Sequence, residues 1–325
     1  MLFRSQKKRA REAHKSVDIL VNDSKETDQG TVFIGYDQTN LKDCEVSLLD
    51  TISLEGETYL IFDRTPFYAE MGGQRGDEGT VFINDQSLII TDVIKDSNGH
   101  FLHKIKKAEH QNQFSGKAIV SVNQNLRQDI QRHHTATHIL HWALREVLGE
   151  HVKQAGSLVE QNRLRFDFSH FEALKDEQLF EIEAIANQKL LLNEMVESYE
   201  ISFSEKPDEV VAFFGEKYGD IVRVVNVGGW SQELCGGTHV SNAGEIGSIR
   251  ITSESAISAG NRRIEAVAGS AAFNWANQRI ITFNQLLRQL PANRKKYFKE
   301  LHRSRKRIKI WRKKSAPLTR RIKLD

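Results

Sequence analysis

The chain has 325 residues, of which 39% are apolar and 27% charged, with a formal net charge of +3. This content suffices for one or two hydrophobic cores, and no apolar run is long enough to cross a membrane. The only cysteines, Cys44 and Cys235, cannot form a disulfide scaffold. A soluble protein of a reducing compartment, the cytoplasm, is therefore expected.

Residues 1–30 are basic and are predicted to be a connecting helix or linker. The opening MLFRSQKKRAREAHK lacks the serine richness of a transit peptide and contains Glu12.

Residues 31–115 are predicted to form a small antiparallel β-barrel, because short β-type runs alternate there with turn residues. The runs are Thr31 to Tyr36, Cys44 to Leu49, Thr58 to Asp63, Gly79 to Ile83, Ser87 to Ile94 and His100 to Ile105. Gly72-Gly73-Gln74 falls between two of them and is interpreted as a turn. No catalytic role is assigned to Gln74.

Residues 116–270 mix helical and β-type patterns, which predicts an α+β layer structure. Helices are expected over Asn125 to Leu148 and Asp176 to Asn193, and strands over Leu164 to Phe168, Glu197 to Phe203, Ile221 to Val227, Gly247 to Ser253 and Arg262 to Ala268. A last helix should run from Ser270 to Arg288.

Two pairs of residues, each spaced by four, offer the donor set of a zinc site. His134 and His138 lie one turn apart on the first helix, and Cys235 and His239 flank Gly-Gly-Thr. Zinc takes Cys sulfur and His nitrogen in tetrahedral geometry, so two distant pairs can complete one shell. Gly236 and Gly237 lack the Cβ atoms that would stop the chain from curling tightly around an ion, so the second pair should converge without a helix.

Two alternatives weaken this ligand set. The histidines could be ordinary helix residues and Cys235 a small buried apolar side chain. In addition, His133 and His141 lie close to the first pair in sequence, so the pair could include a false candidate.

Residues 271–325 are predicted to be a C-terminal helix and a basic tail. From Arg294 to Asp325 there are fifteen Lys or Arg against two acids, so the rest of the chain is net acidic. Such a run indicates a polyanion partner, or a solvated, disordered end.

The stretch RHHTATHILHWALREVLGEHVKQAG from Arg132, with LCGGTHV at 234–240 and AGNRRIEAVAG at 259–269, resembles the editing domain of alanyl-tRNA synthetases. FYAEMGGQRGDEGTV from Phe67 resembles the small barrel that precedes it in that family. The resemblance thus covers about residues 30–270, in the family's order. It implies hydrolysis of tRNA(Ala) mischarged with serine or glycine, at its aminoacylated 3′ end, because pockets cannot reject near-isosteres by binding alone.

Several residues gain candidate roles. Gln154 could position a water or the substrate, and the resemblance also places it in the editing pocket. Thr137 could meet the serine hydroxyl, although helical threonines often bond back to a carbonyl. Arg262 and Arg263 would suit the tRNA phosphates. Carboxylates should orient the histidines, with Asp167 a candidate.

One zinc ion is expected, acting as a Lewis acid if one ligand is weak, or otherwise shaping the pocket. The zincin mechanism is excluded, because Thr135 stands where its general base would be. The segment before residue 30 is too short for an aminoacylation domain, which would need ATP, so a fragment or a free-standing editing protein is expected. A separate aminoacylation chain is a candidate partner. A zinc-stabilised tRNA-binding module and an inactive fragment are the alternatives.

Overall fold

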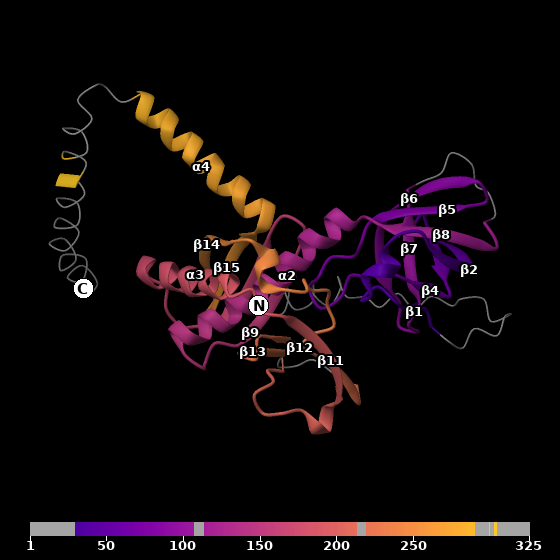
Figure 1. Cartoon of the computed structure of the whole chain (residues 1–325), viewed down its shortest axis with the longest axis horizontal. Helices are drawn as coiled ribbons and strands as arrows, with labels where there is room; N and C mark the ends of the chain where they lie inside the picture. Colours follow the sequence, from indigo (N-terminus) through magenta and orange to yellow (C-terminus); the bar gives the residue numbers. More distant parts are fainter. Residues whose placement is uncertain (1–29, 107–113, 213–218, 290–298, 300–301, 304–325) are drawn as a thin grey trace, which may run out of the picture. The chain divides into compact units, whose positions relative to one another are not determined.

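The computed structural model describes residues 30–106, 114–212 and 219–289, together with 299, 302 and 303 (Figure 1). The chain divides into two compact units, residues 1–273 and 274–325. The predicted N-terminal connecting helix and nearly all of the basic tail lie outside the described residues.

The first part of unit 1 is a closed barrel of six antiparallel strands in the order β2-β3-β7-β6-β5-β8. Their bounds are β2 (Cys44–Leu54), β3 (Glu57–Phe62), β5 (Gly79–Ile83), β6 (Gln86–Lys95), β7 (Phe101–Ile105) and β8 (Lys117–Val122). The predicted antiparallel barrel is confirmed. Its hairpin β5–β6 turns through Asn84 and Asp85, both at positive φ, as a two-residue hairpin loop requires.

The barrel differs from its sequence prediction at both ends. Strand β8 closes it between β5 and β2, so the barrel continues past residue 115, where we had ended it. This strand was missed because Ile119 on its outer face is exposed and hides the alternation of buried and polar positions. At the start, β1 is only Val32–Phe33 and pairs in parallel with β4 (Arg64–Thr65), outside the barrel sheet.

The second part of unit 1 is α+β, as predicted (Figure 1). One antiparallel sheet has the order β14-β15-β10-β9, and a smaller one has the order β11-β12-β13. The elements are α2 (Gln124–Leu148), β9 (Gln154–Val159), β10 (Leu164–Ser169), α3 (Asp176–Leu191), β11 (Val196–Ser202), β12 (Ile221–Val227), β13 (Ser231–Leu234), β14 (Ile249–Ser258) and β15 (Asn261–Ala268), with 3-10 turns at Gln38–Leu41, Phe203–Glu205 and Ala243–Ile246.

Helix α2 carries the core of this part. Its Ile139, Leu140 and Leu144 are fully buried and belong to the same core as Phe166 of β10 and Ile182 of α3. Burying large aliphatic and aromatic side chains stabilises a domain by about 1.5–3 kcal/mol each. Because this core fixes the rotation of α2, it also fixes which way the histidines of the helix point.

The N-terminal end of α2 is tied to the barrel. Arg127 is 1% exposed and pairs with the equally buried Asp77. The guanidinium also donates to the backbone carbonyls of Gly35 and Pro66, each at 2.9 Å. All of these partners precede strand β8, so one buried cation joins the two parts of unit 1.

Helix α4 (Gly269–Gln289) begins in unit 1 and continues into unit 2, close to the predicted range. Along the residues that the structure describes, no helix combines the length and the apolar character that a membrane span needs.

Candidate metal centre

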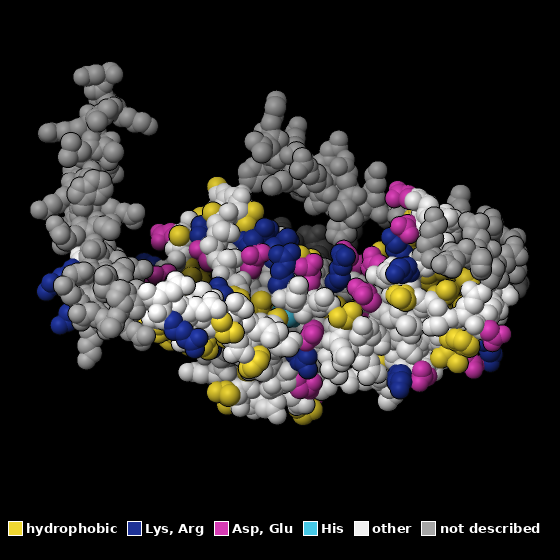
Figure 2. Space-filling model, turned by 90° about the horizontal axis from the view of Figure 1, so that it is seen from above, with side chains coloured by type: hydrophobic (Ala, Val, Ile, Leu, Met, Phe, Trp, Pro, Cys, Tyr) yellow, Lys and Arg dark blue, Asp and Glu magenta, His cyan; other side chains and the backbone are white. Residues whose placement is uncertain are grey.

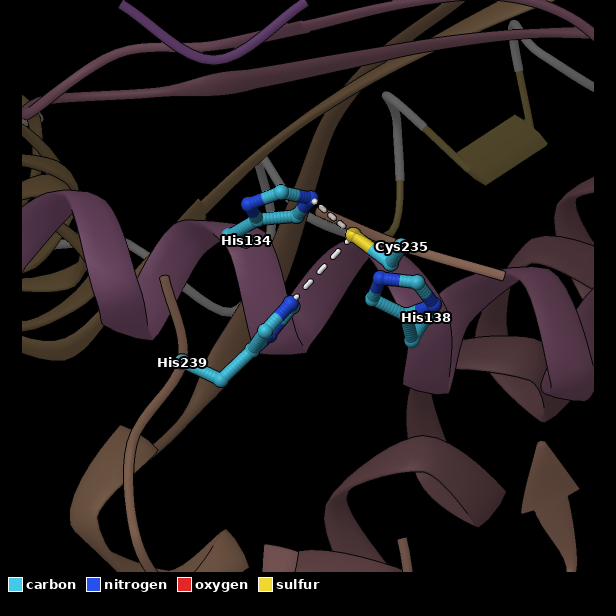
Figure 3. A group of neighbouring side chains, drawn as sticks. All are labelled: His134, His138, Cys235 and His239. Carbon is cyan, nitrogen blue, oxygen red and sulfur yellow. Dashed lines mark hydrogen bonds between the residues drawn. The ribbon is translucent and has the colours of Figure 1, made fainter. Parts of the chain in front are cut away.

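Four side chains from two distant segments meet in one place (Figure 3). Helix α2 supplies His134 and His138, and the loop after β13 supplies Cys235 and His239. Their ligand atoms all lie within 4.8 Å of one another. The two pairs that the sequence singled out are therefore brought together as predicted.

The geometry of the group fits zinc. Cys235 Sγ lies 3.3 Å from His134 Nε2 and 3.4 Å from His239 Nε2. Tetrahedral zinc with ordinary Zn–S and Zn–N bonds separates its sulfur and nitrogen ligands by about 3.5 Å. The cluster could thus hold one metal ion, and its three imidazoles and one thiol are donors that zinc prefers.

Each imidazole of the cluster has its Nδ1 bonded to an oxygen and so presents Nε2 to the centre. The pairs are His134 with Gln74 Oε1 at 2.7 Å, His138 with Glu233 Oε2 at 2.5 Å, and His239 with Thr135 Oγ1 at 3.1 Å. Such outer hydrogen bonds fix the tautomer and the orientation of metal-binding histidines. The three oxygens come from the loop between β4 and β5, from β13 and from α2.

Glu233 contacts two histidines of α2, of which only His138 belongs to the cluster. Its second oxygen, Oε1, accepts from His141 Nδ1 at 2.7 Å, and His141 is not among the four residues whose ligand atoms converge. Burial acts to raise the pKa of Glu233, but the two histidines outweigh it and hold the pKa below its ordinary value. The carboxylate is therefore charged.

His133, the other ambiguous histidine, has a structural role. Its Nδ1 donates to the carbonyl of Asp129 at 2.8 Å, and its Nε2 accepts from the backbone N–H of Ala268 at 3.0 Å. Burial lowers its pKa, so the ring stays neutral with both nitrogens in use. His133 thus joins α2 to the end of β15.

The electrostatics of the cluster favour metal-binding forms of two ligands. Burial acts to raise the pKa of Cys235, but His134 and His239 outweigh it and hold that pKa well below its ordinary value. Burial lowers the pKa of His239 to about 3. For His138 burial acts in the same direction, yet the Glu233 carboxylate outweighs it and raises the pKa to about 10. A metal ion must therefore displace a proton from His138.

Close packing explains one glycine of the Cys-Gly-Gly-Thr-His loop. A Cβ at Gly237 would lie 1.9 Å from His134 Cε1 and 2.8 Å from Gln74 Oε1. At Gly236 the nearest atom would be Met71 Cε, at an ordinary 3.8 Å. Neither glycine has a positive φ. The missing Cβ at Gly237 thus allows the close approach of the loop to His134, as the sequence predicted, whereas a Cβ at Gly236 would find room.

The structure places the other predicted site residues as follows. Gln154 is the half-buried first residue of β9 and pairs with Phe168 of β10. Thr137 is buried, and its hydroxyl donates to the carbonyl of His133 at 2.8 Å, the backbone bond weighed as its alternative. That bond uses its proton but leaves an oxygen lone pair. The roles assigned to both residues stay predictions.

The two predicted phosphate-binding arginines are paired with acids of unit 1. Arg262 Nε lies 2.5 Å from Glu254 Oε1, and Arg263 donates to both carboxylate oxygens of Asp167 at 2.7 and 2.8 Å. Asp167 is thus engaged with an arginine, and Glu233 is the carboxylate that contacts a predicted ligand.

Sequence reasoning missed Glu233 and Gln74 as parts of the site. Glu233 stands two residues before Cys235, on a strand we did not predict, where alternation would have pointed it to the same side. Gln74 was noticed within Gly-Gly-Gln, but no spacing rule connects it to a helix sixty residues later.

Family models of aminoacyl-tRNA synthetases match two stretches of the chain. A family model described as "Threonyl and Alanyl tRNA synthetase second additional domain" matches residues 222–265, and one described as "tRNA synthetases class II (A)" matches residues 2–126. The chain is thus related to the class II tRNA synthetases.

Similar curated proteins narrow the relationship. The chain is 46% identical over 298 residues to the alanine–tRNA ligase of Opitutus terrae, covering 89% of this chain and 32% of that protein. It is 42% identical over 293 residues to that of Caldicellulosiruptor saccharolyticus, covering 86% and 33%, and 42% identical over 294 residues to that of Staphylococcus aureus, covering 88% and 34%. The chain is a homologue of the alanine–tRNA ligases and spans about a third of their length.

Proposed function

We propose that this chain carries the editing activity of an alanine–tRNA ligase. It would hydrolyse the ester that joins serine or glycine to tRNA(Ala) and so remove the errors that the aminoacylation pocket cannot exclude. The observation that carries the proposal is the buried His134, His138, Cys235 and His239 cluster. The homology to alanine–tRNA ligases and the match to the second additional domain over residues 222–265 support it.

A pocket beside the cluster offers room for part of a substrate. It has a volume of about 140 Å³ and shares His239 and Thr238 with the metal loop. Gln131, Tyr36 and Arg223 also line it. We infer that the aminoacylated 3′ end of the tRNA enters here, where the walls offer hydrogen-bond donors and acceptors.

The residues predicted from the sequence keep their candidate roles. Gln154 would position the attacking water or the substrate, and the free lone pair of Thr137 would accept from a serine hydroxyl. Arg262 and Arg263 would bind tRNA phosphates only by exchanging or sharing their carboxylate partners. On the face in Figure 2, Lys and Arg side chains are interspersed with Asp and Glu.

Zinc, when bound, would supply either Lewis acidity at the ester or a fixed framework for the pocket. The chain's own residues prepare the site in both cases. Glu233 orients His138, and Thr135 orients His239, so that the ligand nitrogens converge on one point. Cys235 must stay reduced, which suits the cytoplasm, where we place the activity. The aminoacylation step that produces the mischarged tRNA needs ATP, and a separate aminoacylation chain is one candidate source of it.

A zinc-stabilised tRNA-binding module is the second candidate. It is favoured by the set of four donors, because four protein ligands complete a tetrahedral shell and leave no position for water. An inactive fragment of a synthetase is the third reading, and an upstream reading frame with class II motifs would favour it.

The test is release of serine from Ser-tRNA(Ala) by the purified chain. We expect release by the untreated chain and by Cys44→Ala, and loss after chelation and in Cys235→Ala. Cys44 is the chain's other cysteine and lies on barrel strand β2, so it controls for thiol removal alone. A folded, zinc-loaded chain that releases no serine would refute the proposal.

Gln154→Ala separates the hydrolase from the binding module. We expect this variant to bind zinc normally and to lose serine release. If the chain is only a tRNA-binding module, Gln154→Ala should leave tRNA binding and every other measurable property unchanged.

A further inference from the structure

Gln74 reaches the metal centre from a tight turn between β4 and β5. This turn belongs to the part of unit 1 that precedes α2, called the barrel part below. Met71 and Gln74 exchange backbone hydrogen bonds of 3.2 and 3.0 Å across the turn. Gly72 and Gly73 between them have φ of 61° and 85°, which glycine adopts without strain. Gln74 itself is 0% exposed. The sequence Gly-Gly-Gln thus points one amide side chain into the protein.

Backbone contacts fix this turn against strand β9. The carbonyl of Gly73 accepts from Val159 N at 2.7 Å, and Arg75 N donates to Val159 O at 3.0 Å. A Cβ at Gly73 would lie 2.6 Å from the carbonyl oxygen of Ser157, so only glycine allows this approach. The position of Gln74 is therefore set by main chain on both sides.

The amide of Gln74 makes three hydrogen bonds. Its Oε1 accepts from the backbone N–H of Thr238 at 2.9 Å, and because a main-chain N–H can only donate, this contact fixes which end of the amide is the oxygen. Oε1 also accepts from His134 Nδ1 at 2.7 Å, and Nε2 donates to Thr238 Oγ1 at 2.9 Å. His134 consequently carries its proton on Nδ1 and directs the bare Nε2 toward Cys235.

A second side chain of the barrel part holds the same metal loop. The hydroxyl of Tyr36 donates to the carbonyl of Gly236 at 2.6 Å. Its ring lies 4.1 Å from the guanidinium of Arg223, which donates at 2.9 Å to the carbonyls of Cys235 and Gly237. The carbonyls of Cys235, Gly236 and Gly237 thus all accept hydrogen bonds. Among the described side chains of the barrel part, only Gln74 forms a hydrogen bond with a predicted metal ligand, His134.

We propose that Gln74 is a positioning residue of the metal centre, through which the barrel part fixes His134 as an Nε2 ligand. The inference rests on the proposed function only in requiring that the cluster binds zinc. Gln74 acts through His134 and need not touch the reacting atoms. Loss of an outer partner of a metal-binding histidine typically weakens metal binding by about 10- to 100-fold.

The experiment measures zinc affinity of the full chain by competition with a chromophoric chelator, and the visible spectrum of the Co²⁺-substituted chain. Gln74→Leu removes the acceptor at similar volume, and Gln74→Glu keeps it. Gln86→Leu makes the same change at a half-buried position of the β5–β6 hairpin. We expect about 10- to 100-fold weaker zinc binding and an altered cobalt spectrum in Gln74→Leu, near-normal values in Gln74→Glu, and no change in Gln86→Leu.

Wild-type affinity and spectrum in a folded Gln74→Leu chain would overturn the inference. Should that variant not fold, Gln74→Glu and the imidazole ¹⁵N spectrum of the zinc-loaded wild type decide: a proton on His134 Nδ1 supports the inference, and a proton on Nε2 overturns it. A wild-type chain that binds no zinc would refute both this inference and the proposed function. Zinc binding that depends on Gln74 without serine release would refute the hydrolase alone.

Discussion

Replacing Gly237 by alanine tests the geometry of the centre most directly. The added Cβ would lie 1.9 Å from His134 Cε1 and 2.3 Å from its Nδ1. Carbon atoms in contact normally stand about 3.5–4.0 Å apart, so the ring or the loop must move by roughly 1.5–2 Å. The neighbouring contact to Gln74 Oε1, at 2.8 Å, closes the nearest direction of escape.

Such a displacement is large for a metal site. Metal–ligand distances tolerate only about 0.2 Å, so Gly237→Ala should cost His134 as a ligand or shift Cys235 and His239 with the loop. Because even outer partners are worth about 10- to 100-fold in affinity, we expect zinc binding to weaken by at least about 100-fold. Overpacking should also lower the free energy of unfolding by about 1–3 kcal/mol.

Gly236→Ala is the matched control, one residue away. Its Cβ would meet only Met71 Cε at 3.8 Å, and the carbonyl that Tyr36 contacts is unchanged. Zinc competition and serine release would be measured on both variants, with circular dichroism to monitor folding. Equal zinc affinity in the two variants would refute the close approach of the loop to His134.

Three further outcomes follow from buried polar groups. Glu233→Gln should weaken zinc binding by about 10- to 100-fold in the same competition assay, because an amide has one oxygen for two imidazole donors. His103 is neutral in the barrel and its pKa is lowered to about 4 by burial, so the unfolded chain alone gains its proton between pH 6.5 and 4. The free energy of unfolding should therefore decrease by up to about 3 kcal/mol as the pH is lowered from 6.5 to 4. Denaturant titrations of His103→Gln should lack this contribution to the acid destabilisation. Arg127→Met leaves Asp77 buried without its cation and should cost about 3–5 kcal/mol in the same titrations; a change under 1 kcal/mol would contradict the buried pair.

Local sequence patterns were sufficient to predict the two pairs of metal ligands, His134 with His138 and Cys235 with His239. A spacing of four on an amphipathic helix places His134 and His138 on one face whatever the rest of the chain does. The same pattern predicted α2 to within one residue at its start and gave its end, Leu148, correctly. Short strands between turn residues likewise predicted most of the barrel.

The outer partners of the ligands could not be obtained in that way. Gln74 contacts His134 only because the Gly72-Gly73 turn is docked on β9, and this docking is a tertiary event. The ambiguity over His141 had the same origin. Its spacing from His138 suits a ligand, and only the folded position of the loop after β13 shows that Cys235 and His239 converge on His134 and His138.

The division of the outer partners among three elements has a thermodynamic consequence. If Gln74 strengthens zinc binding by a factor of 10 to 100, then zinc must stabilise the docked Gly-Gly-Gln turn by the same factor, because coupling between two binding equilibria is reciprocal. That factor corresponds to about 1.4–2.8 kcal/mol. Chelation should therefore loosen the backbone bonds between this turn and β9, whereas barrel strands remote from the turn should keep their protection. A four-ligand site of this kind links the integrity of the barrel part to the metal, whether or not the metal takes part in the chemistry.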